Sequence, residues 1–172
     1  GDIYVNDAFS CSHRDHASVT KITNYIPSYS GIQINTEVNA LRKITTEIKK
    51  PVTCIIGGSK ISSKINIIKN LIPKFNNIII VGAMANNIFK YQGLKIGKSI
   101  CENNIGRIIQ EIFKYAEKYE CNVYFPKDVK VGKKLNDKSI EKEFREIEDD
   151  DMILDVGSKT LVEIKKIIDN SS

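Results

Sequence analysis

The sequence predicts an α/β fold in which a parallel sheet carries helices on both faces, a Rossmann-like arrangement of three layers. The first observation is that short apolar runs alternate with helical patterns from Val52 onward. The second is that apolar runs at 52–56 and 78–81 flank a segment with helical spacing, which is typical of a βαβ unit. The apolar residues on one face of that helix are Ile61, Ile65, Ile68 and Ile72.

The alternation continues toward the carboxyl terminus. A helix is expected to begin near Met84 and to end by Gly93, and a longer amphipathic helix follows over 105–116. Residues 123–125 are expected to form the next strand. Residues 152–155 then predict a strand and 159–168 a terminal helix. Ser158 is the expected N-cap of that helix, because its hydroxyl can accept a hydrogen bond from the first turn.

The segment between these parts, residues 130–151, is highly charged and lacks a sustained apolar period. We expect a surface excursion that contains a short strand or turn. Its run Asp149-Asp150-Asp151 raises two alternatives, a metal site or a solvated loop before a strand. The loop is favoured, because hard cations normally draw their ligands from spaced positions.

The amino-terminal part has a different character. A loop that contains Pro27 and Gly31 precedes a helical pattern that Pro51 ends. The apolar residues of that pattern are Val38, Leu41, Ile44 and Ile48.

Composition narrows the function classes. The chain has 172 residues, of which 41% are hydrophobic and 27% charged, as in a folded domain of ordinary composition. Its net charge of +5 comes from 26 basic residues scattered among 21 acidic ones, so we expect no nucleic-acid partner. The apolar runs are too short to cross a membrane and no signal pattern is seen, so the expected location is the cytoplasm. The four cysteines are widely spaced, which indicates reduced thiols.

The segment Gly57-Gly58-Ser59-Lys60, followed by Lys64, lies where a strand should turn into a helix. Backbone N–H groups and the positive end of a helix dipole favour phosphate at such a place. The spacing matches neither a P-loop nor the Gly-x-Gly-x-x-Gly of dinucleotide folds. From the pattern alone, a glycine turn with surface lysines is an equally good interpretation.

A second basic segment surrounds Arg14. Its guanidinium can hold two oxygens of a phosphate or carboxylate at once. His13 and His16 flank Arg14 and Asp15, but no further ligands stand at useful spacing, so we expect no metal site here. The remaining alternatives are incidental surface histidines or a basic patch that binds an anion.

Seven segments in one order resemble phosphoglycerate kinase, and the resemblance covers nearly the whole chain. It implies an incomplete form of that family's fold and magnesium-dependent phosphoryl transfer between 1,3-bisphosphoglycerate and ADP, giving 3-phosphoglycerate and ATP in glycolysis. It also implies a monomer. The segments are Asn6-Asp7-Ala8-Phe9, His13 to Ser18, Gly57-Gly58-Ser59-Lys60, Ile78 to Ala85, Gly97-Lys98-Ser99, Phe125-Pro126-Lys127-Asp128 and Ile153 to Gly157.

The resemblance also assigns roles to single residues. Lys60 would follow the transferring phosphoryl group as the catalytic residue, and Lys64 would contact nucleotide phosphate. Arg14 would bind the phosphoglycerate, with His13 in the same basic patch. The further positions implied to contact nucleotide are Gly57, Gly58, Ser59, Gly82, Ala83 and Ile153.

The sequence departs from the family at several positions. Val81-Gly82-Ala83 stands where three successive glycines are common, and Ile153 stands where a glycine is common near the adenine. Larger side chains there would narrow a flat slot for the base. Asp15 replaces a usually small residue and would lower the local positive potential.

Family enzymes are roughly twice as long, and the later glycine-rich loop that carries their magnesium-ligating aspartate has no counterpart here. We therefore expect an internal portion of such an enzyme. Residues 1–34 would be a remnant of the acid-binding domain, 35–50 a linking helix in the hinge, and 51–172 part of the nucleotide-binding domain. The alternative function is a non-catalytic nucleotide-binding or interaction fragment.

Overall fold

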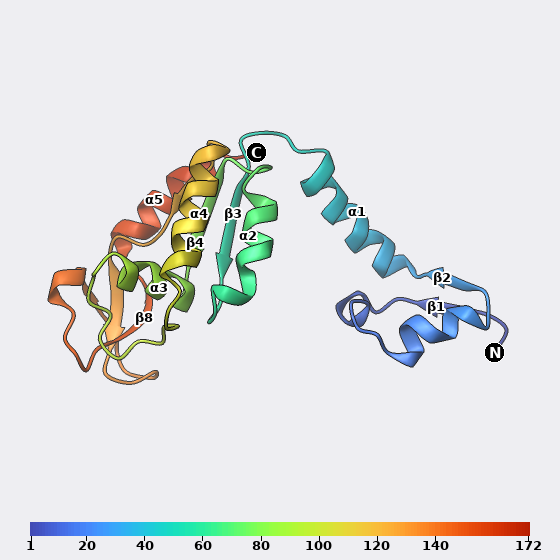
Figure 1. Cartoon of the computed structure of the whole chain (residues 1–172), viewed down its shortest axis with the longest axis horizontal. Coiled ribbons are helices and arrows are strands. Elements are labelled where there is room, and N and C mark those ends of the chain that lie inside the picture. The colour runs from blue at the N-terminus through green and yellow to red at the C-terminus, as the bar shows by residue number, and fades with distance from the viewer. The chain divides into compact units, whose positions relative to one another are not determined.

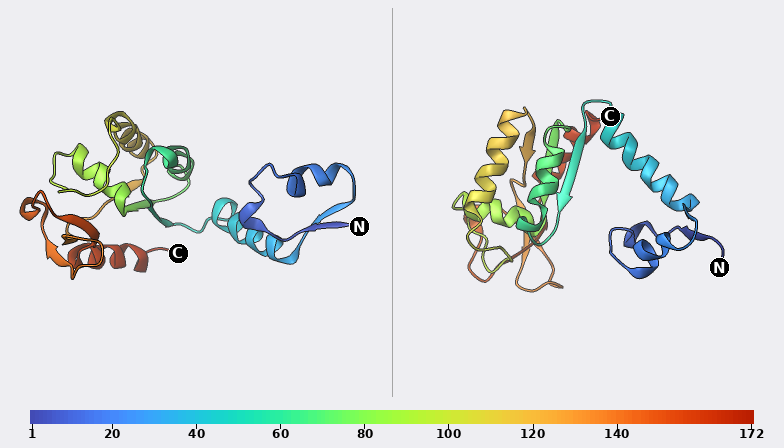
Figure 2. Two further views of the ribbon diagram at one scale, coloured as in Figure 1. Left: turned by 90° about the horizontal axis from the view of Figure 1, so that it is seen from below. Right: turned by 45° about the vertical axis from the view of Figure 1, so that its right-hand side comes forward.

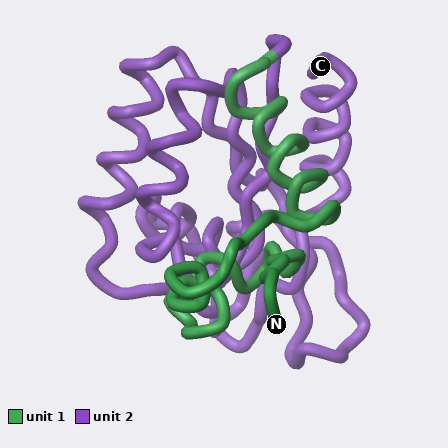
Figure 3. Tube along the Cα trace, turned by 90° about the vertical axis from the view of Figure 1, so that its right-hand side faces the viewer, with its two compact units in different colours: residues 1–48 green, residues 49–172 purple.

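The computed structural model describes residues 1–172, and they form two compact units, residues 1–48 and 49–172 (Figure 3). No helix of the chain combines the length and the apolarity that crossing a bilayer requires.

The first unit contains a two-stranded parallel sheet followed by one long helix. Strand β1 (Tyr4–Asn6) pairs with β2 (Ser28–Ser30), and α1 (Ile32–Thr46) follows β2. The expected helix is therefore present, but it begins before residue 35 and ends at Thr46. Short helical turns connect the two strands: η1 (Phe9–Cys11), the π-helical η2 (Ala17–Lys21) and η3 (Ile22–Asn24).

Helix α1 begins against a carboxylate that is distant in sequence. The N–H of Ile34 donates to Oδ1 of Asp7 at 2.9 Å, and the N–H of Gly31 donates to the carbonyl of Asn6 at 2.7 Å. A Cβ at Gly31 would lie 2.2 Å from the carboxyl carbon of Asp7. Glycine is therefore needed at the start of α1 to make room for the capping carboxylate.

The second unit contains the parallel sheet that the sequence predicts. Strands β3 (Thr53–Gly57), β4 (Asn77–Val81) and β5 (Asn122–Tyr124) pair in the order β3-β4-β5, all parallel. The turn η4 (Ser62–Lys64) and helix α2 (Ile65–Leu71) connect β3 to β4, which confirms the βαβ unit. Helices α3 (Ala83–Tyr91) and α4 (Gly106–Lys118) connect β4 to β5.

Isoleucines dominate the main core. Ile78 and Ile80 of β4 are fully buried on one face of the sheet, beneath Ile68 of α2 and Ile109 of α4. In Figures 1 and 2, α2 and α4 cover this face, and the terminal helix α5 (Ser158–Asp169) covers the opposite one. Helices therefore lie on both faces, as the alternating pattern predicted.

The charged segment after β5 folds into a second sheet. Strands β6 (Val129–Gly132), β7 (Ile140–Lys142) and β8 (Met152–Val156) pair antiparallel in the order β7-β6-β8. The turn η5 (Phe144–Glu146) connects β7 toward β8. The strand expected at 152–155 is therefore present, but it pairs with β6 in this second sheet.

The expected surface excursion is more than a loop, because β6 helps to build a second core. Val129 and Val131 are both buried there, although the residues around them are charged. The other buried members of this core are Ala85, Phe89, Ile96 and Ile147.

The predicted N-cap of the terminal helix is wrong. The hydroxyl of Ser158 donates to Glu141 at 2.7 Å and does not cap α5. Asp128 caps it instead, accepting from the N–H groups of Lys159 at 2.9 Å and Thr160 at 2.8 Å. The hydroxyl of Thr160 also donates to Asp128, at 2.5 Å. The carboxylate lies where a Cβ of Gly157 would be, since that atom would come within 2.3 Å of it.

We expect Gly157→Ala to destabilise the second unit by about 1–3 kcal/mol, because the new methyl group must displace a carboxylate held by three hydrogen bonds. Urea unfolding followed by circular dichroism measures the effect.

The matched control is Gly106→Ala at the first residue of α4, where a Cβ would make ordinary contact with Tyr91 at 3.5 Å. Its stability should stay the same or rise slightly, since alanine favours helix. Equal stability of the two variants would contradict the packing constraint at Gly157.

Candidate functional site

Two glycine turns meet at the carboxyl ends of β3 and β4. Gly58 has φ +151° and Gly82 has φ +65°, both in the region that favours glycine. The N–H of Met84 donates to the carbonyl of Gly58 at 2.9 Å. A Cβ at Gly82 would lie 3.7 Å from the backbone nitrogen of Gly58, so the turns are in direct proximity. This edge is where open α/β sheets bind their ligands.

The lysines of the first turn carry unpaired charge. Lys60 precedes the first helical turn after β3, and Lys64 ends that turn. Neither lysine forms an ion pair within the chain. The side chain of Lys64 passes over Gly58, where its Cε would lie 4.0 Å from a Cβ at that glycine.

The carboxylate of Glu102, which the sequence did not predict, accepts hydrogen bonds at the start of the helical turn that follows. Glu102 accepts from the N–H of Ile61 at 2.6 Å and of Ser62 at 3.1 Å, and also from the hydroxyl of Ser62. Burial would raise the pKa of Glu102, but these hydrogen bonds and the charge of Lys60 outweigh it and lower that pKa. The N–H groups of Ser59 and Lys60 form no hydrogen bond within the chain, so they remain available to a ligand.

An apolar cavity of about 320 Å³ lies beside the second turn. Of the residues predicted to contact nucleotide, Gly82, Ala83 and Ile153 line it together, although Ile153 is distant in sequence. Val81 lines it as well, so three of the positions where the family commonly has glycine (Val81, Ala83 and Ile153) present larger side chains to the cavity. The remaining wall comes from Ala85, Asn86, Phe89, Ile100, Pro126, Val129, Leu135, Met152, Leu154, Asp155 and Val156.

The Gly97-Lys98-Ser99 segment fastens the strand that carries Ile153. The N–H of Ile153 donates to the hydroxyl of Ser99 at 2.8 Å, and the N–H of Lys98 donates to the carbonyl of Asp151 at 2.9 Å. Gly97 has φ +54°, and a Cβ there would lie 2.2 Å from the same carbonyl oxygen. The segment therefore holds the beginning of β8 and with it one wall of the cavity.

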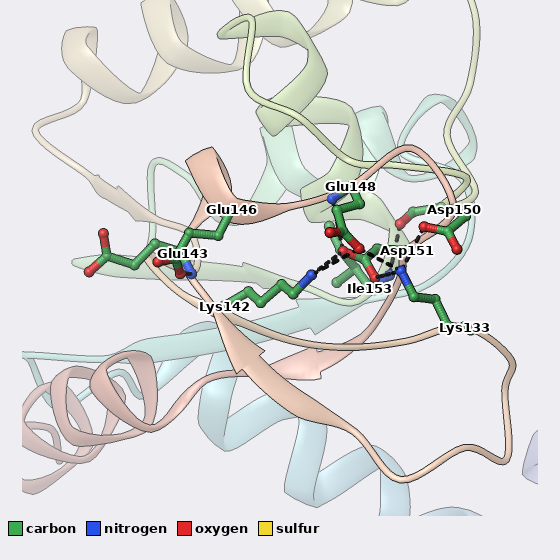
Figure 4. A network of polar contacts seen from close by, with 9 residues as sticks. Lys133, Lys142, Glu143, Glu146, Glu148, Asp150, Asp151 and Ile153 are labelled. Carbon is green, nitrogen blue, oxygen red and sulfur yellow. Dashed lines mark hydrogen bonds and ion pairs between the residues drawn. The ribbon is translucent and has the colours of Figure 1, made fainter.

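A network of ion pairs fixes the same end of β8 (Figure 4). Asp151 is 1% exposed and accepts from Lys142 at 2.8 Å and from the N–H of Glu148 at 2.8 Å. Lys133 lies 2.9 Å from Asp151 and also pairs with Glu148 and Asp150. The expected solvated loop is therefore wrong for Asp151, whereas Asp149 and Asp150 are exposed.

These contacts set the charge of Asp151. Burial opposes its ionisation, but hydrogen bonds from Lys142, Glu148 and Lys133 outweigh burial and lower its pKa strongly. The pKa of Lys133 is raised, chiefly by its hydrogen bond to Asp150. Glu148, Asp150 and Asp151 are the chain's group of clustered carboxylates, and the ammonium groups of Lys133 and Lys142 offset two of its three negative charges.

The predicted acid-binding residues lie in the first unit, apart in the chain from the lysine turn. Arg14 and His13 are exposed, and neither forms an ion pair. The N–H of Arg14 donates to the carbonyl of Cys11 at 3.0 Å, which places it on the turn after η1. The hydroxyl of Thr20 donates to Asp15 at 2.5 Å. The structure leaves the guanidinium of Arg14 free to meet an anion.

The sheet and its paired turns define an open α/β protein with a glycine turn of a kind that suits an anionic ligand. The sequence pattern of the phosphoglycerate kinases matches residues 1–172. The chain therefore belongs to the phosphoglycerate kinase family.

Single relatives agree with this. The chain is 40% identical to a phosphoglycerate kinase of Bartonella quintana over 174 residues, covering 100% of the chain and 44% of that protein. It is 42% identical to one of Wolbachia pipientis wMel over 171 residues, covering 99% of the chain and 43% of that protein. The chain thus spans less than half the length of the curated relatives that it matches.

Solved structures show the same likeness. The phosphoglycerate kinase of Coxiella burnetii superposes with a TM-score of 0.87 at 33% identity, over 99% of this chain and 44% of that one. The enzyme of Pyrococcus horikoshii OT3 superposes with a TM-score of 0.77 at 20% identity, over 99% and 44% of the two chains, which supports the fold.

We expect Asp151→Asn to lower the free energy of unfolding at pH 7 by about 1–3 kcal/mol, because it leaves Lys142 without its buried partner. The pKa of Asp151 is lowered in the folded chain, so its contribution is present above the unfolded value of about 3.9 and is lost as the pH falls below it. Urea unfolding at a series of pH values measures this difference.

Asp150→Asn is the control, because Asp150 binds the same Lys133 from an exposed position. Its stability should match that of the unaltered chain at pH 7. A difference between Asp151→Asn and the unaltered chain that stays constant from pH 7 to pH 3 would contradict the role given to the charge of Asp151.

Proposed function

We propose that the chain is part of a phosphoglycerate kinase that transfers a phosphoryl group reversibly between 1,3-bisphosphoglycerate and ADP. The products would be 3-phosphoglycerate and ATP. The observation that carries the proposal is the glycine turn at the end of β3, which presents Lys60 and Lys64 without any internal ion pair. Family membership supplies the class of reaction, and the turn supplies groups that such a reaction needs.

In the proposed reaction, an oxygen of the ADP β-phosphate attacks the phosphorus atom of the acyl phosphate. The bond from phosphorus to the carboxylate oxygen breaks, and the carboxylate leaves with its electron pair. The enzyme contributes position and charge rather than a covalent intermediate. Lys60 would neutralise charge that spreads over the transferring oxygens, and Lys64 would hold a nucleotide phosphate.

The remaining assignments follow the same proposal. The cavity lined by Gly82, Ala83 and Ile153 would hold the base, with the free N–H groups of Ser59 and Lys60 near its phosphates. Arg14 and His13 would bind the acid. Val81, Ala83 and Ile153 would narrow the slot for the base.

Mg²⁺ would accompany the nucleotide phosphates. The clustered carboxylates of this chain do not fit the role of its ligands, because their oxygens already pair with the ammonium groups of Lys133 and Lys142. We assign no step of the reaction to a metal site built from these residues.

The cellular setting is also a proposal. The four cysteines are free thiols, and burial raises the pKa of Cys121 to about 11, which keeps that thiol protonated and unreactive. Free thiols suit the reducing cytoplasm. We also propose that the protein is a monomer that binds neither nucleic acid nor a membrane.

We expect Lys60→Ala in the complete protein to reduce kcat by at least about 100-fold, since it removes charge from the transferring group. A coupled assay of ATP formation measures the rate. Lys74→Ala is the control, because Lys74 is an exposed lysine beyond the far end of α2. Equal activity of Lys60→Ala and Lys74→Ala would overturn the assignment of Lys60.

We expect Lys64→Ala to weaken binding of magnesium-ADP to this chain by about tenfold, the cost of losing one charged hydrogen bond. Calorimetric titration measures the affinity, with Lys74→Ala again as control. An unchanged affinity would remove Lys64 from the nucleotide site.

A non-catalytic nucleotide-binding or interaction fragment is the second candidate. It is favoured by apolar side chains that remain exposed, including Ile55 on the edge strand β3 at 50% and Ile44 on α1 at 53%. Exposed edges and apolar faces attract partners. Turnover of ATP with 3-phosphoglycerate by this chain alone would refute this candidate.

A further inference from the structure

Asn86 is the polar side chain in the cavity wall with an unmet hydrogen-bonding group. The residue is 3% exposed, on α3, and lines the cavity beside the second glycine turn. Its Oδ1 is buried and has no hydrogen-bond partner, alone among the buried side-chain polar atoms of the chain. Such an acceptor is costly to leave unpaired, so a ligand that donates a hydrogen bond to it gains affinity.

The orientation of this amide is set by its other end. Nδ2 donates to the carbonyl of Ile100 at 3.0 Å, and Ile100 also lines the cavity. Turning the amide over would bring Oδ1 against that carbonyl, and two acceptors at this distance repel each other. Oδ1 is therefore the group left to accept a hydrogen bond from something else.

The neighbouring asparagine shows what a fully paired amide looks like in the same helix. Asn87 is also buried, but its Nδ2 donates to the carbonyl of Ala83 at 3.1 Å, and its Oδ1 accepts from the N–H of Glu102 at 2.7 Å. Asn87 does not line the cavity. Asn87 is therefore fully hydrogen-bonded within the fold, whereas Asn86 has an acceptor without a partner.

The character of the cavity limits the partner. Its walls are mostly apolar, and neither Lys60 nor Lys64 is among the lining residues, so it does not suit a phosphate. A flat heterocycle fits an apolar cavity of about 320 Å³, and its edge can carry the N–H donor that Oδ1 lacks. This step rests on the proposed function, which places the nucleotide base in this cavity.

We propose that Asn86 is a specificity-determining residue, whose Oδ1 accepts a hydrogen bond from the exocyclic amino group of adenine. A base that carries no N–H at that edge leaves Oδ1 unpaired in the complex. Such a site discriminates against that base, because the unmet buried acceptor lowers the binding free energy of the complex.

The experiment compares two ligands, magnesium-ADP and the magnesium complex of purine riboside 5′-diphosphate, which lacks only the 6-amino group. Calorimetric titration of this chain should show about tenfold tighter binding of ADP. In Asn86→Leu the preference should disappear, because ADP binding weakens and binding of the analogue stays the same. Asn87→Ser is the matched control and should keep the tenfold preference even if the chain becomes less stable.

The outcomes separate the proposal from the function on which it rests. If the unaltered chain binds ADP and the analogue equally, the role of Asn86 is overturned while the nucleotide site stands, and this comparison needs no variant. A preference that persists in Asn86→Leu also overturns the role. Binding of neither diphosphate overturns both the role of Asn86 and nucleotide binding by this chain.

Discussion

The structure depends on helices that begin against carboxylates brought from far away in the chain. Asp128 caps α5 across 31 residues to Lys159, and Asp7 caps α1 across 27 residues to Ile34. In both cases a glycine, Gly157 or Gly31, stands at the N-cap with an ordinary negative φ. Space, and not backbone conformation, demands these glycines, because each carboxylate lies where a Cβ would be. The same device thus appears once in each unit.

This capping joins the parts of the second unit that form the cavity. The carbonyl of Asp128 accepts from the N–H of Gly157 at 2.9 Å, so the residue holds the end of β8 with its backbone and the start of α5 with its side chain. At the other end of β8, Asp151 and Ser99 hold the strand. Burial would raise the pKa of Asp128, but hydrogen bonds from Thr160 and Lys159 lower it, so the cap stays charged near neutral pH. One cavity wall is therefore fixed at both ends by ionised carboxylates.

The sequence predicts what depends on local periodicity and misses what depends on distant partners. The isoleucines of α2 and β4 identify the βαβ unit because burial repeats at the helical and strand periods. Strands β6 and β7 carry too many charges for this signal, and of their residues only Val129 and Val131 belong to the second core. Ser158 has a suitable side chain and position for a local cap. The residue that caps α5 is Asp128, which lies 31 residues from Lys159 in sequence, in a segment that was identified only by its resemblance to the family. The resemblance predicted Gly82, Ala83 and Ile153 of the cavity, whereas Asn86 and Glu102 carry no sequence signal beyond their polarity.

The groups that the lysine turn can offer to an anion depend on Glu102, a third carboxylate that comes from a distant part of the chain. Glu102 already takes the N–H groups of Ile61 and Ser62, which a helix N-terminus would otherwise offer to an anion. Helix α2 has only 7 residues, so its dipole adds little. The turn keeps two free N–H groups, on Ser59 and Lys60, together with two mobile ammonium groups. In the proposed function, phosphate affinity at this turn would therefore come mainly from lysine side chains, which can follow a moving phosphoryl group in a way that a fixed helix dipole cannot.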